Sequence, residues 1–266
     1  MATPELSILV PTRGRPDGMR RLLESAQATA ASIPPVAELT PSERVRASRG
    51  VELVYYIDSD DHASQREAER QQETGAAIQI IVGPRIVLSD CWNRCAEIAR
   101  ADILMHCGDD IAFRTPGWDA AVRDAFAGVP DRILFLHGYD NEEKPRGRFG
   151  THGFLHRRWV EAVGYFVPPY FSCDWNDTWL NDVANALGRR LFIPIYTEHL
   201  HPYHGKGKLD QTHRERMARG QRDRVAQLYR QLAPKRQEDV EKLRHAISAR
   251  ALEHPDSHPA ETGAAL

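Results

Sequence analysis

The sequence contains few cysteines and no long hydrophobic run. Its four cysteines, Cys91, Cys95, Cys107 and Cys173, form no CxxC pair and show no zinc-like spacing with histidines. We therefore expect reduced thiols, as in cytosolic proteins. No apolar run approaches the roughly 18 residues of a membrane-spanning helix, and no basic-then-apolar leader opens the chain. These absences argue against secretion and membrane insertion and predict a cytoplasmic protein.

The chain also lacks a strong net charge. Its formal net charge is -2 over 266 residues, which by itself neither favours nor excludes a polyanionic partner. The length fits one α/β domain with an appendage. Basic residues outnumber acidic ones between Lys206 and Arg250. We therefore expect a main domain over residues 1–209, a basic helical extension over 210–252 that breaks at Pro234, and a disordered tail over 253–266.

Short apolar segments alternate with helical patterns through the first 110 residues. The segments are Leu6–Pro11, Val51–Ile57, Ile78–Val82 and Ile103–Met105. Short apolar runs bounded by polar residues are typical of strands buried in a parallel sheet. The regular alternation predicts a doubly wound α/β fold, with a mostly parallel sheet flanked by helices. Residues 33–50, which are rich in proline and show no clean period, are expected to form a surface insertion.

The strand predicted at Ile103–Met105 ends in two adjacent carboxylates, Asp109 and Asp110. Ligands of such sheets bind outside the carboxyl ends of the strands. Neighbouring carboxylates repel each other unless a cation neutralises them, so a divalent metal ion is a natural partner. A solvated acidic turn is the alternative. The second strand also ends in acids, from Asp58 to Asp61, and this rival metal site stays open.

Basic and imidazole side chains follow two other predicted strands. Arg13 and Arg15 lie in the turn after the first strand, where they either bind an anion or are simply solvated. After the strand at residues 191–196 comes a cluster that contains His199, His201, His204, Lys206 and Lys208. Such a cluster can bind a metal ion and a neighbouring phosphate. A basic loop with incidental histidines is the alternative.

Two further carboxylates, Asp174 and Asp177, fall at the start of a predicted helix. A helix dipole favours carboxylates there, so capping alone could explain Asp174. A carboxylate at a helix N-terminus can also act as a general base. The aromatic residues between Tyr165 and Trp179 either stack on an acceptor or build the core.

The order of these features from Ser7 to His204 resembles the inverting GT-A glycosyltransferases, especially the family-two group that uses nucleotide-diphosphate sugars. The resemblance implies a GT-A, Rossmann-like fold with the C-terminal helices outside it. It gives Asp58–Asp61 to the nucleoside and the segment that ends in Asp110 to the metal. By this resemblance the nucleotide would lie against Pro11, Thr12, Arg13, Arg15, Asp58, Asn93 and Asp109, and Lys206 and Lys208 would meet its phosphates.

The same resemblance assigns the metal ligands and the base. Asp110 would be the main metal ligand, joined by a late histidine, His201 in preference to His199. The chain departs from the family's D-x-D-D motif at Cys107. It also has Cys173 where the family's Glu-Asp motif, whose aspartate is the base, begins with an acid. Asp174 would be the catalytic base, with Asp177 as the alternative.

The implied function is that of a metal-dependent inverting glycosyltransferase. It would use Mn²⁺ or Mg²⁺ and a nucleotide-diphosphate sugar, UDP-sugar favoured, and it would glycosylate an acceptor hydroxyl. The compact chain resembles phage-type enzymes that modify hydroxymethylated DNA bases, which would place it in the host cytoplasm; a saccharide or small molecule is the other acceptor class. A nucleotidyltransferase would need a glycine-rich triphosphate loop, and TRGRPDG has only two glycines. A non-catalytic nucleotide or nucleic-acid binding module is the third alternative.

Overall fold

The computed structural model describes residues 3–31, 50–140 and 149–253. Nearly all of the predicted surface insertion at 33–50, part of the loop before residue 150 and the predicted tail after residue 253 lie outside these ranges. Within the described ranges, no helix is long and apolar enough to cross a bilayer.

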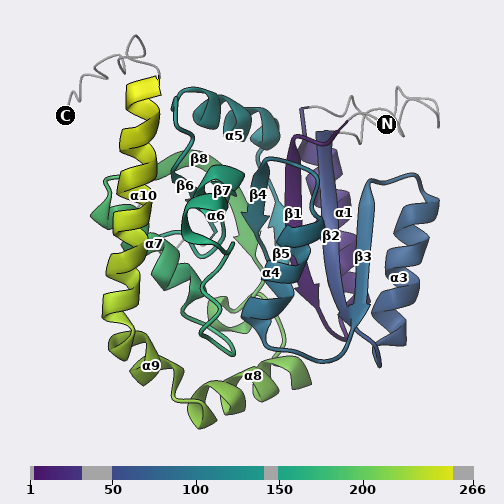
Figure 1. Ribbon diagram of the computed structural model, residues 1–266. Helices are drawn as coiled ribbons and strands as arrows, with labels where there is room; N and C mark the ends of the chain where they lie inside the picture. Colours follow the sequence, from purple (N-terminus) through teal and green to yellow (C-terminus); the bar gives the residue numbers. More distant parts are fainter. Residues whose placement is uncertain (1–2, 32–49, 141–148, 254–266) are drawn as a thin grey trace.

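One eight-stranded sheet forms the centre of the molecule (Figure 1). Its strands are β1 (Leu6–Thr12), β2 (Val51–Asp58), β3 (Ile78–Gly83), β4 (Ile103–His106), β5 (Ile111–Phe113), β6 (Phe135–Tyr139), β7 (Gly153–His156) and β8 (Arg190–His199). They lie in the order β3-β2-β1-β4-β7-β6-β8-β5. β1, β2, β3 and β4 are mutually parallel, as are β6 and β8, whereas β5 and β7 pair antiparallel with their neighbours. The sheet is therefore mixed but mostly parallel, as predicted.

Helices cover both faces of this sheet. One face carries α1 (Pro16–Thr29), α3 (His62–Glu73) and α5 (Trp118–Ala127), and the other carries α4 (Leu88–Ile98), α6 (Arg157–Val163) and α7 (Asn176–Ala186). Side chains of a strand alternate between faces. In β1, Ile8 therefore packs with the first group of helices and Leu9 with the second. Each face buries its own apolar core, which is the arrangement of a doubly wound α/β fold.

The C-terminal region forms three helices where the sequence predicted two. They are α8 (Gln211–Arg222), α9 (Val225–Gln231) and α10 (Ala233–Glu253). Pro234 is the second residue of α10, where its missing N–H costs no hydrogen bond, so it begins a helix there. The earlier break falls at Arg224, whose φ is 50°. α10 packs against α6 and α7 through Val240 and Leu243, so this region shares the hydrophobic core of the sheet.

Two buried glutamates are neutralised by arginines. Glu52 in β2 accepts hydrogen bonds from the hydroxyl of Ser7 (2.6 Å) and from Nε of Arg100 (2.8 Å). Glu67 in α3 accepts a hydrogen bond from Arg70, which lowers the pKa of Glu67 to about 2. Buried carboxylates are costly unless paired and hydrogen-bonded, so these two networks stabilise the half of the sheet that contains β1, β2 and β3.

Candidate active site

A pocket of about 510 Å³ opens where the carboxyl ends of β1, β2 and β4 meet. The end of β8, the segment before α7 and the side of α8 complete its wall. Most of the residues singled out from the sequence line it: Pro11, Thr12, Arg13, Arg15, Asp58, Asp109, Asp110, Asp174, Asp177, His199 and His201. The fold therefore gathers, at one edge of the sheet, side chains that are distant in sequence.

Strand register explains why Asp110 meets a late histidine. β5 runs antiparallel to β8, and Ile111 pairs with His199, so Asp110 lies beside this histidine. The carbonyl oxygen of Asp110 accepts a hydrogen bond from the N–H of Leu200 (2.8 Å). Nε2 of His199 lies 3.3 Å from Oδ2 of Asp110. Burial acts to raise the pKa of Asp110, but the hydrogen bond and charge of His199 outweigh it and hold the pKa below its usual range.

The same edge carries His152, which the sequence analysis did not single out. β7 runs antiparallel to β4 with Gly153 opposite His106, so His152 lies just beyond the end of β4. Its ring packs edge-on against that of His199, with a centroid distance of 4.8 Å. Burial lowers the pKa of His152 to about 4, so its imidazole is neutral at neutral pH. The available signal was a histidine directly before the buried apolar segment of β7.

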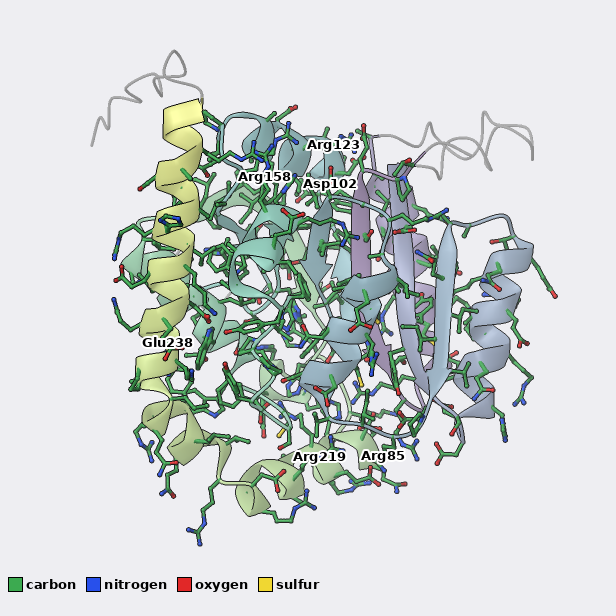
Figure 2. The ribbon with its side chains drawn as sticks, in the orientation of Figure 1. Arg85, Asp102, Arg123, Arg158, Arg219 and Glu238 are labelled. Carbon is green, nitrogen blue, oxygen red and sulfur yellow. The ribbon has the colours of Figure 1, made fainter. Side chains whose placement is uncertain are left out.

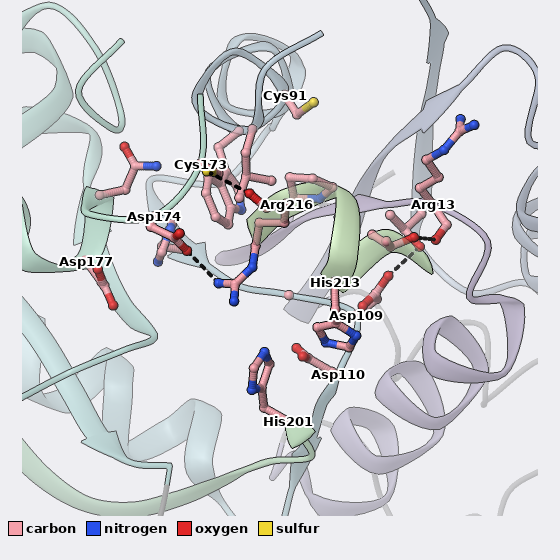
Figure 3. A pocket seen from close by; sticks show the side chains of 18 of the residues that line it. Arg13, Cys91, Asp109, Asp110, Cys173, Asp174, Asp177, His201, His213 and Arg216 are labelled. Carbon is pink, nitrogen blue, oxygen red and sulfur yellow. Dashed lines mark hydrogen bonds and ion pairs between the residues drawn. The ribbon is translucent and has the colours of Figure 1, made fainter. Parts of the chain in front are cut away.

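Two histidine pairs flank the carboxylate of Asp110. His201 and His213 lie on either side of it (Figure 3). Asp110, His201 and His213 form one set whose possible ligand atoms all lie within 4.8 Å of one another. Asp110, His152 and His199 form a second set with the same property. His213 comes from the first turn of α8, a helix that the resemblance left outside the site. Each set can coordinate a divalent metal ion.

Asp109 is held by protein groups on both of its oxygens. Oδ2 accepts a hydrogen bond from the hydroxyl of Thr12 (2.8 Å), and Oδ1 accepts one from Arg15 (2.9 Å). Its backbone also touches α1, since a Cβ on Gly18 would lie 2.7 Å from the Asp109 carbonyl oxygen. Asp109 therefore anchors the chain between β4 and β5 to β1 and α1. Asp110 is the carboxylate that faces His199 and the other histidines of the pocket.

The acidic end of β2 is neutralised by an arginine and a helix. Arg13 donates hydrogen bonds to Asp58 (2.8 Å) and Asp60 (2.6 Å). Asp61 caps α3 by accepting from the N–H of Ser64. Among the described residues, the two clusters able to hold a metal ion both contain Asp110, and neither includes Asp58 to Asp61. The geometry thus favours Asp110, and not the acidic end of β2 at Asp58 to Asp61, as the metal site.

Three residues that the sequence predicts to contact the nucleotide do not line this pocket. The side-chain oxygen of Asn93 accepts hydrogen bonds from the N–H groups of Phe166 (2.9 Å) and Val167 (3.0 Å), so it braces that segment against α4. Lys206 lies outside the pocket and donates to Glu198 (3.0 Å). Lys208 is exposed and also outside it.

Arginines supply the positive charge of the pocket instead. Those that line it, within the described ranges, are Arg13, Arg15, Arg85, Arg216 and Arg219. Figure 2 shows Arg85 at the same end of the molecule as Arg219, which belongs to α8. The ion pair between Arg85 and Glu215 ties the segment after β3 to this helix. α8 therefore forms a charged wall of the pocket.

Asp174 faces the pocket from a strained segment before α7. Its φ is 54°, and α7 begins only at Asn176 with Trp175 in the N-cap position, so capping does not explain Asp174. Oδ1 of Asp174 accepts a hydrogen bond from Nη1 of Arg216 (2.5 Å), as Figure 3 shows. Asp177 lies in the first turn of α7, and its Oδ1 accepts from the N–H of Thr178 (2.7 Å).

The aromatic segment before α7 mainly builds the core. Phe166, Phe171 and Trp179 are buried, and Tyr165 donates a hydrogen bond to Asp239 of α10. For these side chains the structure favours packing in the core over stacking on an acceptor. Trp175 does line the pocket.

Comparisons with known proteins agree with this architecture. No protein-family model and no curated protein matches the sequence. The fold is similar to that of the mannosyltransferase PcManGT from Pyrobaculum calidifontis, solved with GDP-Man and Mn²⁺, with 13% identity, a TM-score of 0.57 and coverage of 97% of this chain and 77% of that one. It is also similar to Staphylococcus aureus TarS 1-349 in complex with UDP-GlcNAc, with 13% identity, a TM-score of 0.51 and coverage of 80% and 64%.

GalNAc-T7, solved with UDP, GalNAc and Mn²⁺, is a third similar structure, with 12% identity, a TM-score of 0.51 and coverage of 74% of this chain and 44% of that one. The chain spans less than two thirds of the TarS and GalNAc-T7 structures. Identities this low establish the fold alone. The chain thus has an α/β fold of the GT-A type, as the sequence predicted.

Proposed function

We propose that this chain is a metal-dependent inverting glycosyltransferase that moves a sugar from a nucleotide-diphosphate sugar to an acceptor hydroxyl. One observation carries the proposal. A single pocket joins the Asp110–histidine cluster, the arginines and the separate carboxylate of Asp174. A simple metal site has no need of a second carboxylate, whereas transfer to a hydroxyl requires a base. The similar structures, solved with UDP-GlcNAc, GDP-Man or UDP, lend support.

The proposed donor, a UDP-sugar in the first instance, fits the charges of the pocket. The nucleoside would lie near Asp58 and the apolar side chain of Ile86, and the diphosphate near Arg216 and Arg219. Asp110 and a histidine of β8 would hold Mn²⁺ or Mg²⁺. That ion would neutralise the charge that develops on the departing nucleotide, and the arginines would add fixed positive charge.

Asp174 is the proposed general base. An acceptor hydroxyl has a pKa far above neutral, so its proton must be removed as it attacks. The carboxylate of Asp174 lies in the pocket wall, and its partner Arg216 also lines the pocket. A donor diphosphate would compete for Arg216, which would free a carboxylate oxygen of Asp174 for the acceptor. Asp177, in the first turn of α7, is the alternative base.

DNA that carries hydroxymethylated bases is the acceptor that we propose to test first. Arg214, Arg222, Arg224 and Arg230 are exposed on α8, α9 and the turn between them, where they could contact phosphates. Phosphate contacts release counterions, so binding should weaken steeply as salt is added. A flat salt response would count against DNA and in favour of a saccharide or small-molecule acceptor.

The test is a thermal-shift screen with Mn²⁺ across UDP-, GDP- and dTDP-sugars, followed by measurement of nucleotide release. We expect one donor class to raise the melting temperature only with the metal ion, and Asp110→Asn to abolish this shift. A shift without turnover of any donor would favour a binding module. Pyrophosphate release from a nucleoside triphosphate would favour a nucleotidyltransferase, although the turn between β1 and α1 spans only residues 13–15.

A further inference from the structure

His152 lies next to the Asp110–His199 pair, where its ring packs against the rings of His106 and His199. We infer that His152 is the third protein ligand of the cation site, and that Asp110, His152 and His199 together select a first-row transition-metal ion over Mg²⁺. The inference deepens the proposed function, on which it rests for the role of the ion. The binding site itself follows from the described side chains.

Buried imidazole nitrogens without partners are the first line of support. His152 is only 9% exposed, and within the described part of the chain neither of its ring nitrogens has a hydrogen-bonding partner. Nδ1 of His199 is likewise buried and without a partner there. Burying a polar atom without a hydrogen bond costs free energy, so such atoms call for an explanation. A bound cation would supply the missing interaction.

The competing histidine pair is already engaged. Nδ1 of His201 accepts a hydrogen bond from the N–H of Tyr203 (3.2 Å). Nδ1 of His213 lies 2.6 Å from Asp210, and the guanidinium of Arg15 lies 2.9 Å from the same ring. A cation on His213 would have to approach this fixed positive charge. The pair His152 and His199 involves no such conflict, so it is the better partner for Asp110.

The backbone holds these ligands in place. His199 donates its N–H to the carbonyl oxygen of Asp140 (2.9 Å), and its register with Ile111 fixes Asp110 beside it. His152 directly precedes Gly153, where a Cβ would lie 2.4 Å from the ring of Phe135. The chain therefore passes too close to Phe135 for any other residue at position 153. Ligands on such constrained strands are preorganised, which favours binding.

The ligand types decide which ion binds. The set offers two imidazoles and one carboxylate, and both oxygens of Asp109 are taken by Thr12 and Arg15. Mg²⁺ prefers an octahedron of oxygen ligands, whereas imidazole suits Fe²⁺, Co²⁺ and Zn²⁺. Mn²⁺ shares the preference for carboxylate and water ligands and is the weakest binder of the first-row series, so Co²⁺ is the more decisive probe. We therefore expect Co²⁺ and Mn²⁺ to bind the metal-free protein, and Mg²⁺ to displace neither at a tenfold excess.

The experiment titrates the metal-free full-length chain with Co²⁺, followed by visible absorption, and with Mn²⁺, followed by calorimetry. His152→Ala should lower the affinity for both ions by at least about 10- to 100-fold. Losing a residue that only hydrogen-bonds to a metal ligand already lowers metal affinity by that factor, and a direct ligand should matter at least as much. His201→Ala and His213→Ala are matched controls that should keep the affinity within a few-fold. Urea unfolding of each metal-free variant checks the fold, and His152→Gln replaces the alanine variant if that does not fold.

Unchanged affinity for Co²⁺ and Mn²⁺ in the folded His152 variant would overturn the inference. Loss of metal binding in His213→Ala would also overturn it. Displacement of Mn²⁺ by Mg²⁺ would overturn the ion preference. The proposed function fails separately. Binding of Co²⁺ through His152 without turnover of any nucleotide sugar would refute the transferase and leave the site standing. Turnover with metal affinity unchanged in His152→Ala would refute the site alone.

Discussion

Replacing Asp174 with asparagine should separate catalysis from donor binding. The asparagine oxygen can still accept the hydrogen bond from Arg216, so the pocket wall should keep its shape. The side chain of Asp174 is 38% exposed, and ion pairs this exposed contribute at most about 1 kcal/mol to stability. General base catalysis contributes about 100- to 10,000-fold to the rate, which equals roughly 3–5 kcal/mol of transition-state stabilisation. The expected loss in kcat therefore far exceeds any effect on folding.

The assay measures initial rates at saturating donor, and calorimetry measures donor affinity in the same preparations. Asp177→Asn is the matched control, because it removes a carboxylate from the same segment. We expect donor affinity to stay nearly unchanged in Asp174→Asn and kcat to fall by at least about 100-fold. An equal loss of affinity and rate would refute the assignment of the base. A larger rate loss in Asp177→Asn would transfer the role to that residue.

Three further predictions concern stability. Arg100→Ala should lower the free energy of unfolding by about 1–3 kcal/mol, because it removes an arginine partner of the buried Glu52. Gly18→Ala should destabilise the protein, because its Cβ would lie 2.7 Å from the Asp109 carbonyl oxygen and overpacking costs about 1–3 kcal/mol, more than the roughly 1 kcal/mol gained in helix propensity. The pKa of Glu67 is lowered to about 2, so its contribution to stability is present above its ordinary pKa of 4.5 and is lost as the pH falls toward 2. Glu67→Gln should therefore flatten the pH dependence of the free energy of unfolding between pH 4.5 and about 2.

Urea unfolding measures all three predictions, and each has a control. Arg94→Ala breaks an ion pair in which both side chains are more than 60% exposed, and it should change stability by less than about 1 kcal/mol. Gly128→Ala places a Cβ no closer than 3.6 Å to its neighbours at an ordinary φ of -70°. For Glu67, unfolding at pH 6 and pH 3 gives the comparison. Equal destabilisation in a variant and its control would contradict the physical reason given for that variant.

Local patterns in the sequence were enough to predict the sheet and the acidic strand ends. The apolar run that ends before Asp109 forms β4, and the one before Asp58 forms β2. Both runs are too short for a typical buried helix and are bounded by polar residues, which favours a strand. The pairing of a late histidine with Asp110 was also predicted, through the order of the motifs. The sequence favoured His201 over His199, whereas in the structure Nε2 of His199 lies 3.3 Å from Asp110 and His201 lies in the second histidine pair beside that carboxylate.

Side-chain direction and long-range pairing, which the sequence does not show, place other predicted residues outside the pocket. Asn93 is on the expected helix but points to the backbone of Phe166, and Lys206 lies beyond the pocket and pairs with Glu198. The arginines of α8 were overlooked because nothing local shows that this helix returns to the carboxyl ends of the strands. Its position depends on long-range ion pairs, between Arg85 and Glu215 and between Arg216 and Asp174.

By itself, the sequence determined the α/β class of the fold, the strand ends that carry charge and the residue types available for chemistry. Those properties depend on hydrophobic periodicity and turn residues, which act over a few neighbouring positions. Only the tertiary structure decided that His152, His199 and Asp110 face one another and that Asp174 meets Arg216. Contacts of this kind follow from strand register and helix packing between distant segments, and a shift of one residue in a strand would turn every side chain to the opposite face.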